Sequence, residues 1–136
     1  MAGSWRNQAA IEQALAVLDE ADATSYCFVR VGYSQAAAAL AAPGGADAAA
    51  LESRAVQELF EQDLAALKSA RRFLVVLPAG QAVHIEAGIA YGLGKPCYAV
   101  GASERSDTLY RIFDEIFPGP EQLAAWLRER ADASAE

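Results

Sequence analysis

The acidic residue best placed to act as a nucleophile is Glu86. It lies in an otherwise apolar segment, between Ile85 and Ile89, near the start of a helix predicted to follow a buried strand. A carboxylate in the first turn of a helix is stabilised by the macrodipole by about 0.3 to 1 kcal/mol, which helps to keep it ionised and nucleophilic. An ordinary first-turn acid would occupy the same position, but a charge among apolar neighbours needs a reason.

A second group of candidate residues precedes the first predicted helix, in the sequence Gly3, Ser4, Trp5, Arg6 and Asn7. Backbone N–H groups, the Ser4 hydroxyl and the Arg6 guanidinium could together hold a phosphate or a carboxylate. The alternative, favoured for this motif alone, is that Ser4 caps the helix and Arg6 is solvated. Trp5 could stack on a base or pack against the core.

Metal and triphosphate chemistry are disfavoured. His84 is the only histidine in the chain, so it is expected to be a hydrogen-bonding residue at a helix start rather than a zinc ligand or a general base. The glycine and lysine at 94–95 follow a helix and precede a strand, which is the reverse of a phosphate-binding loop. We predict no metal and no cofactor.

The elements that must position these residues alternate along the chain. Strand, helix and strand in succession predict a parallel α/β sheet in one domain over residues 1–136. The first strand is expected to be a short stub within residues 1–4, or to begin upstream of Met1. Further strands are predicted at 24–31, 72–77 and 97–100, and helices at 7–22, 47–69, 82–92, 108–113 and 121–131. Asp47 is the expected N-cap of the helix 47–69, and the stripe expected to face the core consists of Leu51, Ala55, Leu59, Phe60, Leu64 and Leu67. An alanine-rich segment at 35–50 is broken by a Pro-Gly-Gly sequence.

The composition limits the kinds of molecule and compartment expected for this protein. The 136 residues are 54% hydrophobic and carry a net charge of -7, so a broad basic surface for a nucleic-acid polymer is not expected. The chain contains neither an apolar run of about 18 residues for a membrane span nor a signal-peptide core. Cys27 and Cys97 stand in separate apolar runs, which predicts reduced, buried thiols and a cytoplasmic protein.

Residues 73–96 resemble the nucleoside 2-deoxyribosyltransferase superfamily, which includes nucleoside 5'-monophosphate N-glycosidases. An apolar strand and a small-residue loop lead to the motif Glu-Ala-Gly-Ile-Ala-Tyr at 86–91 and then to Gly-Lys-Pro at 94–96. Residues 2–7 are similar to the motif that closes the first strand in that superfamily. With Asp63 and Tyr110, the resemblance covers most of the chain except the alanine-rich segment.

The resemblance implies a flavodoxin-like or Rossmann-like three-layer sandwich with a mostly parallel sheet of four to five strands. It also implies a homodimer that cleaves the N-glycosidic bond of a nucleoside or nucleotide. Glu86 would attack C1' of the sugar and Asp63 would assist the leaving base. The substrate contacts implied are Gly3, Ser4, Trp5, Arg6, Asn7, Gly80, Gln81, His84 and Tyr110.

Two departures from the superfamily keep alternatives open. The loop 78–81 lacks the aspartate that transferases usually carry, which favours hydrolysis of a nucleoside 5'-monophosphate over base exchange. Residues 69–72 also lack an acidic residue that often stands there. The alternatives are a Toll/interleukin-receptor-like NAD hydrolase and a non-catalytic nucleotide-binding or interaction domain. The apolar alanines at 36–50 give a further reason to expect a dimer.

Overall fold

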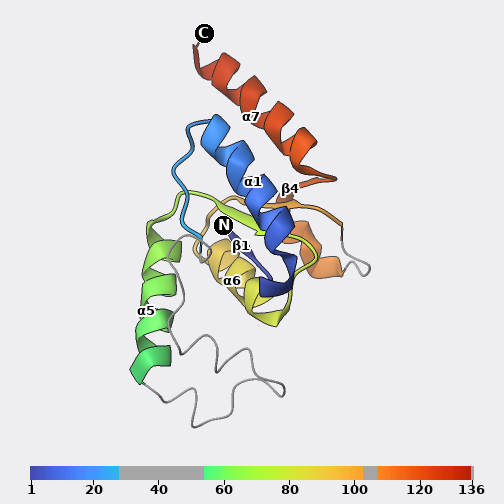
Figure 1. Ribbon diagram of the computed structural model, residues 1–136. Helices are drawn as coiled ribbons and strands as arrows, with labels where there is room; N and C mark the ends of the chain where they lie inside the picture. Colours follow the sequence, from blue (N-terminus) through green and yellow to red (C-terminus); the bar gives the residue numbers. More distant parts are fainter. Residues whose placement is uncertain (28–53, 103–106, 136) are drawn as a thin grey trace. The chain divides into compact units, whose positions relative to one another are not determined.

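The computed structural model describes residues 1–27, 54–102 and 107–135. Its sheet has four parallel strands in the order β1-β2-β3-β4 (Figure 1). The strands are β1 (Ala2–Gly3), β2 (Phe73–Val76), β3 (Cys97–Val100) and β4 (Phe113–Phe117). The predicted α/β fold, consistent with a flavodoxin-like sandwich, is confirmed, and so is the short first strand.

The chain divides into two compact units. The first unit, Met1–Ser25 with Arg71–Glu136, contains the whole sheet. The second unit, Tyr26–Ala70, contains the helix α5 (Arg54–Ser69).

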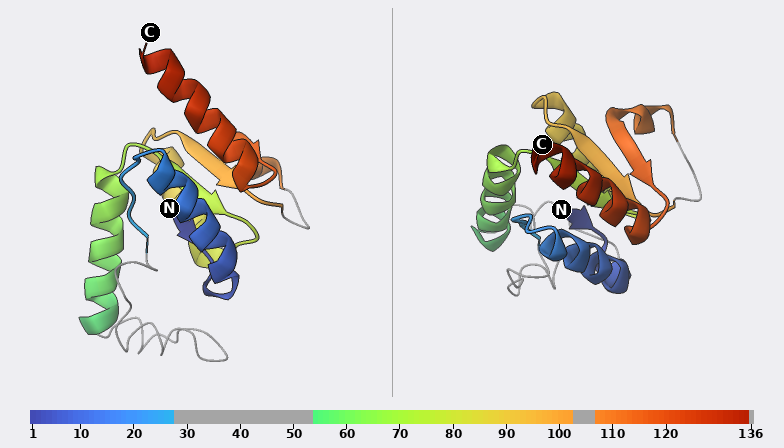
Figure 2. Two further views of the ribbon diagram at one scale, coloured as in Figure 1. Left: turned by 45° about the horizontal axis from the view of Figure 1, so that its top comes forward. Right: turned by 90° about the horizontal axis from the view of Figure 1, so that it is seen from above.

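Helices cover both faces of the sheet in the first unit. The 3-10 helix η1 (Trp5–Asn7) leads into α1 (Gln8–Glu20), which packs against α7 (Pro120–Ala135) on one face. The helix α6 (Gln81–Gly92) covers the other face (Figure 2). Every residue of β2 and β3 is buried, because a central parallel strand is covered on both sides.

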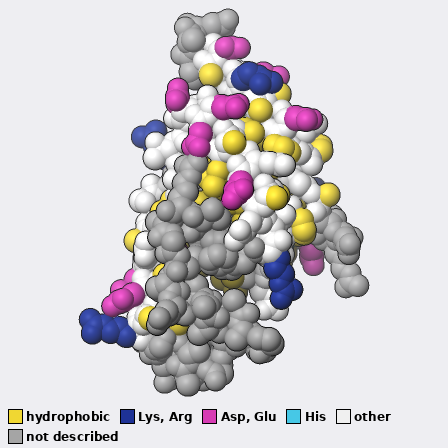
Figure 3. Space-filling view, viewed as in Figure 1, with side chains coloured by type: hydrophobic (Ala, Val, Ile, Leu, Met, Phe, Trp, Pro, Cys, Tyr) yellow, Lys and Arg dark blue, Asp and Glu magenta, His cyan; other side chains and the backbone are white. Residues whose placement is uncertain are grey.

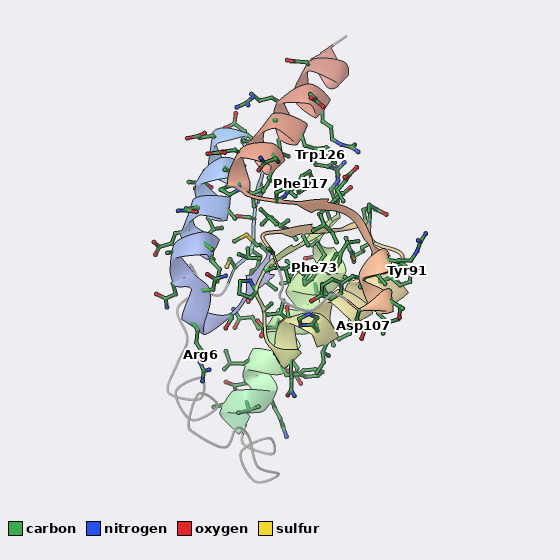
Figure 4. The ribbon with its side chains drawn as sticks, turned by 90° about the vertical axis from the view of Figure 1, so that its right-hand side faces the viewer. Arg6, Phe73, Tyr91, Asp107, Phe117 and Trp126 are labelled. Carbon is green, nitrogen blue, oxygen red and sulfur yellow. The ribbon has the colours of Figure 1, made fainter. Side chains whose placement is uncertain are left out.

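An aromatic cluster fixes α7 to the sheet. Trp126 packs against Tyr98 and Phe117, with ring centroids 5.0 and 5.5 Å apart (Figure 4). The guanidinium of Arg130 lies 4.1 Å from the centroid of the Trp126 ring. A cation over an indole face adds to the stabilisation from burial of the ring, so this cluster holds the first half of α7 against β3 and β4.

The strand β4 is not predicted by the sequence. Helix was predicted for 108–113, whereas the structure has a 3-10 helix, η2 (Thr108–Ile112), followed by the strand from Phe113. Only the two terminal phenylalanines of β4 are buried, and the three residues between them are exposed. An edge strand with this pattern shows neither a continuous apolar run nor a period of two, so the usual strand signals are absent.

The other predicted elements are confirmed to within a few residues where the structure describes them. Residues 24–27, the described part of the predicted strand 24–31, are not in a strand. Residues 28–31, the alanine-rich segment 35–50 and the proposed Asp47 N-cap lie outside the described residues. In α5, Phe60 was predicted to face the core but is 60% exposed, while Leu67 is buried.

The face seen in Figure 3 carries acidic side chains over α1 and α7, as the net charge of -7 would suggest. In the part of the chain that the structure describes, we find no helix that combines the length and the apolar character required to cross a membrane.

Replacing Gly3 with alanine is expected to lower the free energy of unfolding by about 1–3 kcal/mol. A Cβ there would lie 2.7 Å from Cδ1 of Ile11 and 3.3 Å from Cβ of Val76, so α1 could not pack as closely on β1. Urea unfolding of Gly3→Ala beside Gly92→Ala tests this, because a Cβ at Gly92 meets nothing within 4 Å. Equal midpoints for the two variants would contradict the close approach.

Candidate functional site

The carboxyl ends of the strands are the candidate site, because loops and helix N-termini converge there in an open parallel sheet. The chain continues from β1 into Ser4, from β2 into Leu77 and from β3 into Gly101. Hydrogen bonds join these ends. The side-chain amide of Asn7 donates from Nδ2 to the carbonyl oxygen of Leu77 at 3.2 Å, and the backbone N–H of Gly101 donates to the carbonyl oxygen of Phe117 at 2.8 Å.

The first loop carries a cap and an exposed cation. The Ser4 hydroxyl oxygen accepts a hydrogen bond from the backbone N–H of Arg6 at 3.3 Å and caps η1. The side chain of Arg6 is exposed and points outward (Figure 4). The capping alternative is therefore what the structure shows for Ser4, and Arg6 is open to an anion in solution. The side chain of Trp5 lies outside the described residues.

Asn7 should matter for stability as well as for the site. Losing its bond to Leu77 is expected to lower the free energy of unfolding by about 1 kcal/mol in Asn7→Ala. Asn7→Asp is expected to be worse, because a carboxylate oxygen would face the carbonyl oxygen of Leu77 with no proton between them. Thermal unfolding at pH 7 measures both, with Gln8→Ala as an exposed neighbouring control. Unfolding temperatures that match the control for both variants would show that the bond contributes nothing.

Glu86 lies deeper in its helix than the sequence indicated. The helix α6 begins at Gln81 after the N-cap Gly80 and has no acid in its first turn, so Glu86 stands in the second turn. The prediction of a first-turn carboxylate is wrong, and the stabilisation expected from the macrodipole falls off beyond that turn. Glu86 is partly buried and is the only acid of α6.

The helix separates Glu86 from His84. The buried face of α6 consists of Val83, Ala87 and Ala90. Because successive residues turn by about 100° around a helix axis, Glu86 and His84 project from opposite flanks of this buried face. His84 contacts Tyr110, which follows β3, and α6 also packs on β1. Glu86 therefore projects away from the flank that contacts Tyr110.

His84 and Tyr110 form a hydrogen-bonded pair on the other flank. Nδ1 of His84 lies 2.6 Å from the carbonyl oxygen of Gly80, and Nε2 lies 2.8 Å from the hydroxyl oxygen of Tyr110. The two rings are stacked, with centroids 5.7 Å apart and planes 19° apart. Tyr110 also packs edge-on against Phe113 at 5.6 Å. The structure thereby brings together three of the predicted contacts, Gly80, His84 and Tyr110, and Gln81 lies exposed beside them.

Asp63 belongs to the second unit, on α5. It is partly buried, and its carboxylate oxygen accepts a hydrogen bond from the Tyr26 hydroxyl at 3.2 Å. Burial raises the pKa of Asp63 above the ordinary value of 3.8, and the Tyr26 bond opposes this only in part. A carboxyl group with a raised pKa gives up its proton less readily and is better suited to protonating a leaving group.

The raised pKa of Asp63 predicts a pH-dependent effect of Asp63→Asn. Between pH 3.8 and the higher folded pKa, the folded chain holds this proton more tightly than the unfolded chain. Rising pH through that interval therefore destabilises the native protein but not the variant, so the variant's advantage in free energy of unfolding should grow with pH and then level off. Urea unfolding across this range, beside Glu61→Gln on the same helix, measures the difference. An advantage that does not vary with pH would contradict the assignment.

Both cysteines are free and buried, as predicted. Burial and the neighbouring charge of Asp114 raise the pKa of the Cys97 thiol, which lowers its thiolate fraction. In the described part of the chain, no three histidine, cysteine or carboxylate side chains gather as metal ligands would.

The pairing of His84 with Tyr110 could not be found in the sequence. The two residues are 26 positions apart and belong to different elements, so no local spacing connects them. No protein-family model matches the chain, and no curated protein is significantly similar to it. The function must therefore be argued from the residues at this edge of the sheet.

Proposed function

We propose that the protein cleaves the N-glycosidic bond of a nucleoside or nucleotide, with Glu86 as the nucleophile. The proposal rests on the position of Glu86: it is a partly buried carboxylate and the only acid of α6, and helix periodicity places it on the flank opposite His84. The loop that follows β1 bears Ser4, Arg6 and Asn7, which are polar groups suited to a sugar or its phosphate.

The chemistry has two steps. A carboxylate oxygen of Glu86 forms a bond to C1' while the bond from C1' to the base nitrogen breaks, and the departing base takes up a proton. Water then attacks C1', loses a proton and releases the sugar from Glu86. A second base in place of water would give transfer. This is the double displacement of retaining glycosidases, with a transition state resembling an oxocarbenium ion.

Asp63, in the second unit, is the candidate acid that the resemblance implies. The support comes from its own surroundings, since burial raises its pKa above the ordinary value of 3.8. An acid that remains protonated at higher pH is a better proton donor in the working range.

The proposed substrate is a nucleoside 5'-monophosphate, and the proposed reaction is hydrolysis. Arg6 is exposed near the N-terminal end of α1, where a guanidinium could pair with a phosphate. Loop 78–81 has no aspartate to hold an incoming base. No cofactor takes part in the proposed steps.

The test is the release of free base, followed by chromatography, from nucleosides, nucleoside 5'-monophosphates and NAD. We expect release from one class of nucleoside or nucleotide, lost in Glu86→Gln and retained in Glu129→Gln, which makes the same chemical change at an exposed position of α7. Activity that survives in Glu86→Gln would overturn the role of Glu86. Nicotinamide release from NAD would favour the alternative of an NAD hydrolase.

A non-catalytic nucleotide-binding domain is the second candidate. It is favoured by the second-turn position of Glu86, where the helix dipole gives little support to an ionised nucleophile. Saturable binding of a nucleotide by calorimetry, with no base released over hours, would support this candidate and contradict the first.

A homodimer is also proposed. Ile85 on α6 and Leu93 directly after it are 64% and 48% exposed, and such apolar side chains are commonly buried by a second copy of a chain. Light scattering at micromolar concentration should give twice the mass of the chain. The mass of a single chain would contradict a dimer.

A further inference from the structure

The Tyr110 hydroxyl lies beside the one histidine of the chain. The chain contains five tyrosines and one histidine. Nε2 of that histidine, His84, lies 2.8 Å from the Tyr110 hydroxyl oxygen. His84 is exposed and Tyr110 partly so, so a small molecule in solution can reach the pair.

The carbonyl of Gly80 determines where the protons of this pair lie. A carbonyl oxygen can only accept, so the short 2.6 Å contact places a proton on Nδ1 of His84. In the neutral imidazole Nε2 then has a lone pair and must accept, so the Tyr110 hydroxyl donates to it. Nucleophile, base and a third group that orients the base are the three parts of an activated nucleophile.

We propose that His84 acts as a general base on the Tyr110 hydroxyl and makes Tyr110 a second nucleophilic centre, which takes small activated carboxylic esters. Stacking of the imidazole on the phenol ring, 19° from parallel, and the edge contact with Phe113 hold the tyrosine in place. This centre is distinct from Glu86, which projects from the opposite flank of α6.

The proposed step is acyl transfer. The Tyr110 oxygen forms a bond to the carbonyl carbon of the ester, and its proton passes to Nε2 of His84. The bond from the acyl carbon to the leaving oxygen breaks, and that oxygen takes the proton from Nε2 as the alcohol leaves. The products are acyl-Tyr110 and an alcohol, with His84 neutral again. A phenol is almost fully protonated at neutral pH, so proton removal must accompany bond formation.

The test is acetylation by p-nitrophenyl acetate at pH 7, with the modified residues located by mass spectrometry over time. Tyr91 is the internal control, because it is 57% exposed and has no histidine of its own. We expect Tyr110 to be acetylated roughly 10-fold to 100-fold faster than Tyr91, and His84→Gln to bring Tyr110 down to the rate of Tyr91. Equal rates in the native chain, or a fast Tyr110 in His84→Gln, would overturn the proposal.

A second measurement does not depend on reactivity. Because the chain has one histidine, its two ring nitrogens give a single pair of 15N resonances. The geometry requires the neutral ring to carry its proton on Nδ1, which is visible in the shifts of the two nitrogens. A ring protonated mainly on Nε2 would remove the acceptor for the Tyr110 proton and would also overturn the proposal. Neither measurement depends on glycosidic activity, so the role proposed for Glu86 can fail while this one holds.

Discussion

Gly101→Ala is expected to lower the free energy of unfolding by about 2–5 kcal/mol. Gly101 follows β3 with a φ of +108°, a backbone conformation that residues with a side chain rarely adopt. A Cβ there would lie 2.5 Å from the carbonyl oxygen of Leu77, a backbone atom at the end of β2 that cannot move aside. The clash could be relieved only if the loops after β2 and β3 moved apart. The hydrogen bond from the Gly101 N–H to the Phe117 carbonyl oxygen opposes that movement.

Gly94→Ala separates the cost of a positive φ from the cost of the steric clash. Gly94 has a φ of +78°, but a Cβ there meets nothing within 4 Å, so this variant should lose only the backbone part, about 1–2 kcal/mol. Gly88→Ala, in an open position within α6, should be neutral or stabilising by up to about 1 kcal/mol. Urea unfolding of all three variants gives the order of their free energies of unfolding. A Gly101→Ala chain no less stable than Gly94→Ala would show that the loops after β2 and β3 are not in close contact.

Glu86→Ala is expected to lower the rate of base release by about 10³-fold or more, and a small anion should restore part of it. Removing the carboxylate removes the nucleophile that forms the bond to C1'. The space left by the side chain can admit azide or formate, which would attack C1' directly. The sugar product with azide should have the inverted configuration at C1', because one displacement replaces two. Chromatography of the base and NMR of the sugar follow both effects.

Two comparisons decide how this result is interpreted. Glu86→Gln fills the same space without a charge, so it should be as slow as Glu86→Ala and should not respond to azide. Glu129→Gln should behave as the native chain does with and without the anion. If Glu86→Ala retains its rate, or if azide accelerates all the variants alike, Glu86 is not the nucleophile.

The two central strands could be predicted because their burial on both faces requires apolar residues at every position. Both β2 and β3 are four-residue strands covered on two faces, so each is a continuous apolar run. The strand β4 could not be predicted, because three of its five residues face water. Helical spacing predicts Phe60 in the core, yet it is 60% exposed, since spacing defines a stripe but not how far round the helix burial extends.

The candidate site was predictable as a set of loops but not as a set of contacts. The rule for parallel sheets identifies the loops that begin at Ser4, Leu77 and Gly101. The rotation of α6, however, depends on which of its small residues pack on the sheet, and that rotation puts Glu86 and His84 on opposite flanks. Residues predicted to line one pocket are therefore divided between two flanks of one helix.

The most direct test of the central claim is to detect the glycosyl group on Glu86. A fluorine at C2' of the substrate withdraws electron density from C1' and slows both the formation and the hydrolysis of the intermediate. A good leaving base restores the rate of formation only, so the covalent intermediate should accumulate. We expect intact-mass spectrometry to show an increase of one fluorinated sugar, or of its 5'-phosphate, and peptide mapping to place it on Glu86. An unmodified chain during continuing base release, or a sugar attached to any other residue, would contradict the proposed nucleophile.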